Sequence, residues 1–112
     1  MIAPNVAAGH NVWFAGHWGF QWYAEKAGAR CLTITPPRPL SGDLAVSSLN
    51  TFGYAVTLFP QRKLLATLDD TTPGGRIMSK KLGSGFYSNY WGYLPWAWGS
   101  ESLDCFDLWQ LE

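Results

Sequence analysis

Residues 12–35 decide the fold, and they read VWFAGHWGFQWYAEKAGARCLTIT. The stretch opens with the short apolar run Val12–Ala15, which stands between Asn11 and Gly16 and predicts a buried strand. It closes with Arg30–Thr35, whose alternating side chains predict a second strand. The residues between them are long enough for a crossover helix, so the two strands are expected to be parallel.

The middle of this stretch, Trp18–Ala27, predicts the crossover helix. Trp18, Trp22 and the pair Tyr23/Ala27 recur at helical spacing, with polar residues on the other sides, so we expect this stripe to face the core. Gly28 follows directly, where a left-handed cap is expected. Gly16-His17 is expected to form the turn between strand and helix.

The rest of the chain adds strands and turns. The expected strands are Leu44–Ser48, Leu64–Leu68, Arg76–Lys81 and Phe106–Leu111, with a turn at Pro73-Gly74-Gly75 and a long shaped loop over residues 85–99. The segment Thr51–Phe59 fits a short helix and a strand equally well. Together these elements predict an α+β fold, or a small three-layer α/β fold, with a mixed sheet and one principal helix in a strand–helix–strand unit.

Composition limits the classes of protein to consider. The chain has 112 residues, with eight basic and eight acidic residues and a formal net charge of zero. This length predicts a single domain over residues 1–112. Its basic residues are scattered, which argues against double-stranded nucleic acid as a partner. No apolar run is long enough for a transmembrane segment. The first residues, Met1–Gly9, lack the features of a secretory signal, so we expect a cytoplasmic protein.

Two aromatic blocks, Trp13–Tyr23 and Phe86–Trp98, contain six of the seven tryptophans. A domain of this size cannot easily bury so many rings, and exposed rings indicate a ligand or partner surface. We therefore expect a non-catalytic domain that binds a saccharide or another small molecule in an aromatic-lined pocket. The expected ligand-binding residues are His17, Trp18, Tyr87, Tyr90 and Trp91. For this arrangement, residues 16–20 and 87–91 must lie side by side.

The low charge also favours self-association, and a two-fold dimer is the simplest form. The expected interface residues are Tyr93, Trp96 and Trp98, which the surrounding Pro95 and glycines hold in an extended loop. A purely structural oligomer, with the aromatics serving only as its interface, is one alternative function. A small enzyme with His17 as general base is the other.

Catalytic and metal signatures are absent from the sequence. His17 would need a carboxylate from elsewhere in the fold to act as a base, and a hydrogen bond to the backbone of its own turn is the simpler role. The spacing of the histidines and cysteines fits no zinc motif, so no metal, cofactor or catalytic residue is expected. Ser84 lies between adjacent glycines, which does not match a nucleophile elbow. Cys31 and Cys105 are expected to be buried thiols, with a disulfide between them as the alternative.

Three segments in the same order carry a family resemblance: residues 12–28, 41–46 and 85–96. They resemble stretches near the C-terminus of bacterial membrane glycosyltransferases of the dolichyl-phosphate-mannose mannosyltransferase-like family (family 39). The resemblance implies a free-standing version of a soluble extracytoplasmic region that follows the last membrane helix. The catalytic carboxylates of that family belong to its transmembrane part, so the resemblance implies no transferase activity here. An extracytoplasmic location would then require fusion to a membrane protein.

Overall fold

The computed structural model describes residues 1–33, 35–50, 53–69, 71–79, 81–102 and 104–112. These residues group into two compact units, unit 1 (residues 1–68 and 106–112) and unit 2 (residues 69–105), and each is described by itself. The single domain expected over 1–112 stays a prediction. The elements are α1 (Ile2–Ala7), β1 (Val12–Ala15), α2 (Trp18–Lys26), β2 (Arg30–Cys31), β3 (Leu44–Ser48), the 3-10 helix η1 (Gly53–Leu58), β4 (Arg62–Asp69), β5 (Gly74–Arg76), β6 (Met78–Ser79), β7 (Ser84–Gly85), β8 (Ala97–Gly99) and β9 (Cys105–Leu111).

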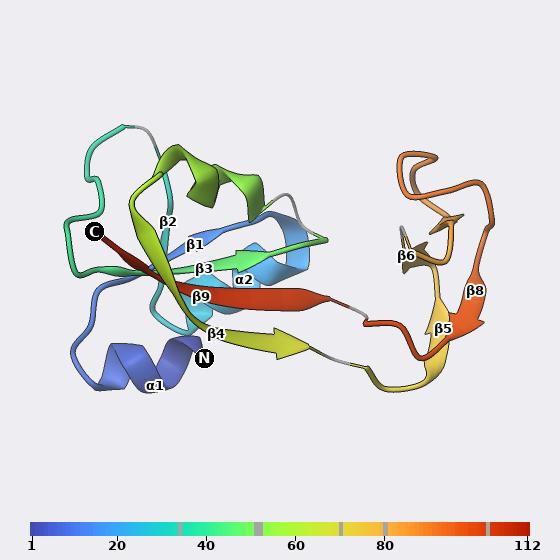
Figure 1. Ribbon diagram of the computed structural model, residues 1–112, viewed down its shortest axis with the longest axis horizontal. Helices are drawn as coiled ribbons and strands as arrows, with labels where there is room; N and C mark the ends of the chain where they lie inside the picture. The colour runs from blue at the N-terminus through green and yellow to red at the C-terminus, as the bar shows by residue number, and fades with distance from the viewer. Residues whose placement is uncertain (34, 51–52, 70, 80, 103) are drawn as a thin grey trace. The chain divides into compact units, whose positions relative to one another are not determined.

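Unit 1 is built on a five-stranded sheet with the order β2-β1-β3-β9-β4 (Figure 1). β1 pairs in parallel with both β2 and β3, and β3 pairs antiparallel with β9. The sheet is therefore mixed, and β1, α2 and β2 form the strand–helix–strand unit that the sequence predicts. The predicted α+β fold class is confirmed.

The two central strands, β1 and β3, are buried along their whole length. Because successive side chains point to opposite faces, each strand contributes to two separate cores. Phe14 and Val46 lie in the core that α1 and α2 cover. Trp13 and Ala45 lie in the second core, which η1 covers through Val56. Figure 1 shows η1 above the sheet and α1 below it. Coverage of both faces explains why neither strand alternates apolar and polar residues: β1 is apolar throughout, and β3 is apolar up to two buried serines, Ser47 and Ser48.

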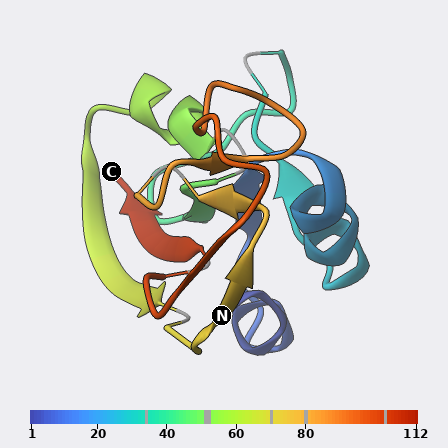
Figure 2. The ribbon, with the colours of Figure 1, turned by 90° about the vertical axis from the view of Figure 1, so that its right-hand side faces the viewer.

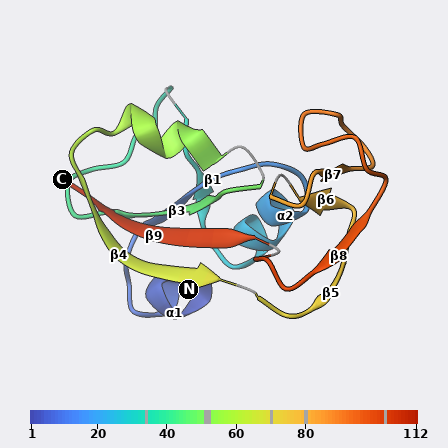
Figure 3. The same cartoon turned by 45° about the vertical axis from the view of Figure 1, so that its right-hand side comes forward.

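The edges of the sheet are β2 and β4. β2 has only two residues, much shorter than the strand expected over Arg30–Thr35, of which residue 34 lies outside the described residues. β4 has eight residues, and nearly all of them are exposed. Figure 2 shows β4 along the outside of unit 1, and Figure 3 shows it running beside β9. The long edge is consequently open to solvent.

Helix α2 packs on the sheet through Ala24 and Phe20. Ala24 is buried, and Phe20 packs against the same core with its ring edge-to-face on Phe14. Trp22 and Tyr23 of the predicted stripe are exposed, so the expectation that they face the core is wrong for these two. The small side chain of Ala24 lets the helix lie close to the sheet, and a tryptophan at that position would hold it away. Gly28 follows the helix with the expected positive φ.

Three further segments differ from expectation. The N-terminal α1 was not among the expected elements; its Pro4 lies in the first turn, where proline is tolerated. The ambiguous segment Thr51–Phe59 contains η1, and residues 51–52 lie outside the described residues. The turn expected at Pro73-Gly74-Gly75 is wrong at both glycines, since they belong to β5 and pair with Gly99 and Trp98 of β8.

Unit 2 contains two short antiparallel strand pairs, β5 with β8 and β6 with β7. The strand expected over Arg76–Lys81 is divided between β5 and β6, and residue 80 lies outside the described residues. Arg76 is almost fully buried, and its guanidinium donates to the backbone carbonyls of Thr72 and Glu101. This side chain ties the two ends of the unit together.

Candidate functional site

The carboxyl ends of β1 and β3 form a topological switch point in unit 1. β2 and β3 lie on opposite sides of β1, and the register pairs Ala15 with Ser47 at the same end of both strands. From there the chain continues into α2 over one face and toward η1 over the other. Ligands of open α/β sheets bind outside such an edge, so this end of the sheet is a candidate site.

His17 stands at this edge as the residue that precedes α2. Its backbone is extended, its side chain is exposed, and it makes no capping hydrogen bond to the helix. Helix capping by His17 is therefore wrong, and its expected hydrogen bond to the backbone of the turn stays a prediction. Trp18 is the first residue of α2, so the strand–helix–strand topology places both predicted residues at the switch point.

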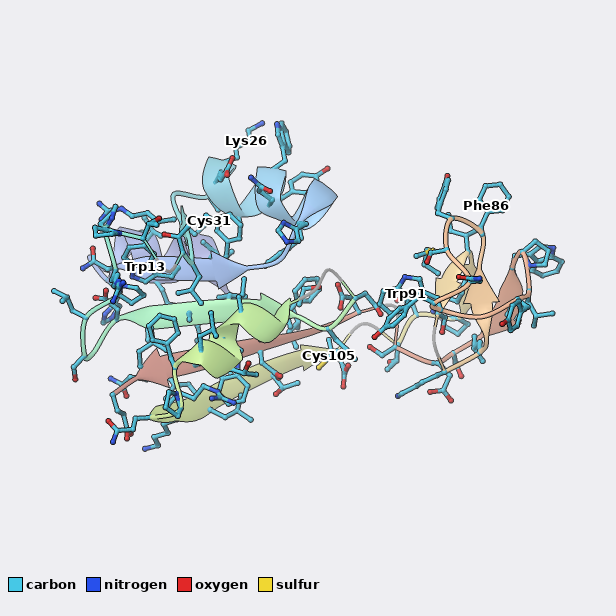
Figure 4. The ribbon with its side chains drawn as sticks, turned by 90° about the horizontal axis from the view of Figure 1, so that it is seen from above. Trp13, Lys26, Cys31, Phe86, Trp91 and Cys105 are labelled. Atoms are coloured by element: carbon cyan, nitrogen blue, oxygen red, sulfur yellow. The ribbon has the colours of Figure 1, made fainter. Side chains whose placement is uncertain are left out.

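The second aromatic block gives unit 2 an exposed set of rings, which we name the aromatic surface. Its members are all exposed: Phe86, Tyr87, Tyr90, Tyr93, Trp96 and Trp98. Tyr93 is the extreme case, with 92% of its surface open to solvent. Figure 4 shows the ring of Phe86 standing clear of its loop. Five predicted residues belong to this set of rings: Tyr87 and Tyr90 as ligand-binding residues, and Tyr93, Trp96 and Trp98 as interface residues.

A tight glycine crossing holds the loop that carries these rings. Gly85 donates its amide to the carbonyl of Leu94, and Leu94 donates to that of Gly83, at 2.8 and 3.0 Å. A Cβ on Gly92 would lie 1.9 Å from the Gly83 carbonyl oxygen, and one on Gly85 would lie 2.2 Å from that of Ser88. No other residue type fits at either position without moving the backbone. The loop is thus braced by its own main chain.

Two ring pairs set the orientation of individual tyrosines. Tyr90 meets Trp91 edge-to-face with the centroids 5.5 Å apart, and Tyr87 meets Phe86 in the same way at 4.8 Å. Trp91 is buried, unlike the other predicted ligand-binding residues of this block. Its ring therefore packs against the ring of Tyr90, and little of its own surface is exposed to solvent.

Charge is absent from the part of the sequence that carries the aromatic surface. Residues 82–100 contain no aspartate, glutamate, lysine or arginine. The ion pair just outside this stretch, Lys81 with Glu101 at 3.4 Å, is exposed and neutralises both groups. A surface of tyrosine and tryptophan without charges suits a neutral ligand that has both apolar and hydroxyl groups.

Asp43 is a buried carboxylate in unit 1 that was not among the predicted site residues. It accepts hydrogen bonds from the Trp13 indole at 2.8 Å, the Leu40 amide at 3.0 Å and the Asn11 side chain at 3.1 Å. Burial by itself raises the pKa of Asp43. The three donors, together with the charge of Arg30, outweigh burial and lower the pKa below its usual value. Because the chain's own donors satisfy the carboxylate, it anchors the loop before β3.

Neither cysteine forms a disulfide, so the disulfide alternative is wrong. Cys31 is exposed, contrary to the expected burial, because β2 is a two-residue edge strand; Cys105 is half-buried. Partial desolvation of the sulfur and the charge of Glu25 raise the pKa of Cys31. Within the described ranges, no group of histidine, cysteine and acidic side chains could hold a metal ion. Within the same ranges, no helix has the length and apolarity needed to cross a membrane.

Searches of protein-family models, curated proteins and solved structures found no match to this chain. The resemblance to membrane glycosyltransferases stays a prediction. The two predicted halves of the pocket belong to different units, with His17 and Trp18 in unit 1 and Tyr87, Tyr90 and Trp91 in unit 2. That residues 16–20 and 87–91 lie side by side likewise stays a prediction.

Proposed function

We propose that this protein is a non-catalytic binding domain that takes a neutral saccharide against the aromatic surface of unit 2. The observation that carries the proposal is the exposure of six aromatic side chains on a stretch without charges. Sugar rings have apolar C–H faces and hydroxyl rims. Tyrosine and tryptophan complement both, through their ring faces and their polar O–H and N–H groups.

The fixed backbone of the loop supports a role of these exposed rings in ligand binding. An aromatic ring on a flexible loop loses conformational freedom when it binds, and that cost lowers affinity. Here the glycine crossing at Gly85 and Gly92 fixes the backbone before any ligand arrives. The Trp91 ring fixes Tyr90 from the buried side. Preorganised rings of this kind are typical of ligand sites.

The lack of charged residues beside the aromatic surface favours a neutral saccharide over charged flat ligands. A single-stranded nucleic acid would also stack on tyrosine and tryptophan, but its phosphates need a basic groove. The nearest cation to the uncharged stretch, Lys81, is paired with Glu101. A neutral sugar needs no counter-charge, so it fits this surface better.

The test is a screen of fluorescently labelled protein on an array of neutral glycans, with hits measured by titration calorimetry. We expect Trp98→Ala to weaken binding about tenfold, because a stacked ring contributes on the order of 1.4 kcal/mol. Trp22→Ala, an exposed tryptophan on α2 of unit 1, is the matched control and leaves affinity unchanged. Uniformly blank arrays, or equal losses in both variants, would overturn the proposal.

His17→Ala adds a separate measurement. If His17 and Trp18 join the same pocket, this variant weakens the binding of the same glycan. Unchanged affinity assigns the ligand to unit 2 alone. The switch point of unit 1 then takes no part in glycan binding. No observation favours the alternative of an enzyme with His17 as base.

A further inference from the structure

The long edge of the unit 1 sheet is the most unusual surface outside the aromatic one. β4 is the last strand in the order, with β9 on one side and, among the described residues, no strand on the other (Figure 2). It runs for eight residues, Arg62–Asp69, without proline or glycine. Its three leucines, at positions 64, 65 and 68, are between 44% and 54% exposed. An open apolar edge of this length is a template for strand pairing.

The charges on β4 are arranged with opposite signs at its two ends. The strand starts with Arg62 and Lys63, continues through uncharged residues and ends with Asp69. An antiparallel partner with the same sequence would place its acidic end against the basic end of β4. The strand is therefore complementary in charge to itself in the antiparallel direction only.

Lys63 makes this edge selective. A lysine on an edge strand opposes most incoming strands, because pairing would place its charge against a residue that does not neutralise it. A partner with an acidic residue at the matching position removes that obstacle. A second copy of β4 supplies one through Asp69.

We propose that the protein forms a two-fold dimer by antiparallel pairing of β4 with β4 of a second copy, which continues the sheet across the interface. The register places Ala66 on the two-fold axis. Lys63 of each copy then lies opposite Asp69 of the other, and Leu64 lies opposite Leu68. The Lys63–Asp69 ion pair and the Leu64–Leu68 contact therefore each occur twice, because the dimer is symmetric.

Contacts within the chain favour this register over the neighbouring one, which would pair Arg62 with Asp69. Arg62 is already engaged, since its guanidinium lies 5.0 Å from the centre of the Trp109 ring and donates to the carbonyl of Phe59 at 2.8 Å. Lys63 is exposed, so its ammonium group is accessible to a carboxylate of a second copy. Asp69 is held in place by the Ser102 hydroxyl at 2.7 Å.

The test exchanges the charges on purified full-length protein and measures mass by light scattering at about 100 µM, where a contact of micromolar affinity is populated. We expect wild type at twice the 12.5 kDa chain mass. Lys63→Asp and Asp69→Lys each place like charges opposite one another twice, so each weakens self-association about tenfold or more. An equimolar mixture of the two variants restores the dimer, because both cross-copy pairs again join opposite charges.

Two controls keep the result specific. Arg38→Asp changes the net charge as Lys63→Asp does, on the exposed loop that follows β2, and it retains the dimer. Trp96→Ser with Trp98→Ser removes the interface expected from the sequence and also retains it. A monomeric wild type, a mixture that stays monomeric, or loss of the dimer in either control would overturn the proposal.

Discussion

The buried carboxylate of Asp43 is expected to contribute strongly to the stability of unit 1. Its carboxylate faces three donors, two of which meet the same oxygen. We expect Asp43→Asn to lower the free energy of unfolding by about 2 kcal/mol, because the new amide group turns an N–H toward a donor. Urea unfolding at pH 7 measures the change. Glu25→Gln removes the same charge from an exposed pair with Gln21, and it should have little effect.

The pKa of Asp43 also predicts a pH dependence. Since the folded-state pKa lies below the usual value of about 4, the carboxylate stabilises the fold above that value. The contribution is lost as the pH falls from about 4 through the folded-state pKa. Asp43→Asn should therefore lose less stability than wild type over that range, as measured by urea midpoints. Parallel curves for the two proteins would contradict the assignment.

At the scale of elements, the glycine crossing of unit 2 gives the sharpest contrast between two similar substitutions. Gly92 has a φ of +148°, and its Cβ position overlaps the Gly83 carbonyl. We expect Gly92→Ala to destabilise unit 2 by about 3 kcal/mol, because both the backbone and the space exclude a methyl group.

The readouts are the near-ultraviolet circular dichroism of the rings and hydrogen exchange at the Gly85 and Leu94 amides, whose bonds close the crossing. Gly75→Ala is the matched control in the same unit, since a Cβ there meets nothing within 4 Å. Its effect should stay within about 0.5 kcal/mol. Equal spectra for the two alanine variants would show that the crossing does not brace the loop.

Elements with a single strong signal were predictable from sequence. Val12–Ala15 is a short apolar run bounded by Asn11 and Gly16, and it formed the expected strand, as did Leu44–Ser48. The buried face of α2 was not predictable, because burial at Ala24 depends on how closely the helix approaches the sheet. The division at Ile77 between β5 and β6 likewise depends on pairing with distant strands.

The candidate site was predictable only in part, for the same reason. Gly16-His17 was located at the end of a strand by local pattern alone. That this end is a topological switch point follows from β2 and β3 lying on opposite sides of β1, which no local pattern contains. The role of Asp43 was not predictable from local sequence, because two of the groups that donate hydrogen bonds to its carboxylate belong to Asn11 and Trp13, some thirty residues earlier in the chain.

On the scale of the whole molecule, the two units differ in how they are stabilised. Unit 1 contains both hydrophobic cores, whereas Trp91 is the one buried apolar side chain among the described residues of unit 2. The buried polar residues of this unit are Arg76, Ser79 and Ser84. Because apolar burial is the main source of local stability, amides of unit 2 should exchange with solvent faster than those of β1 and β3.

Hydrogen exchange on the wild-type protein can then separate the two proposed surfaces in one experiment. A bound glycan stabilises only the state that holds it, so protection should rise in residues 83–98 as glycan is added. Dimerisation through β4 should instead protect the β4 amides that point away from β9, and that protection should rise with protein concentration. High salt should reverse the second effect, because it screens the paired charges of Lys63 and Asp69. Concentration-dependent protection that appears in the aromatic loop, with none in β4, would assign the dimer interface to Tyr93, Trp96 and Trp98.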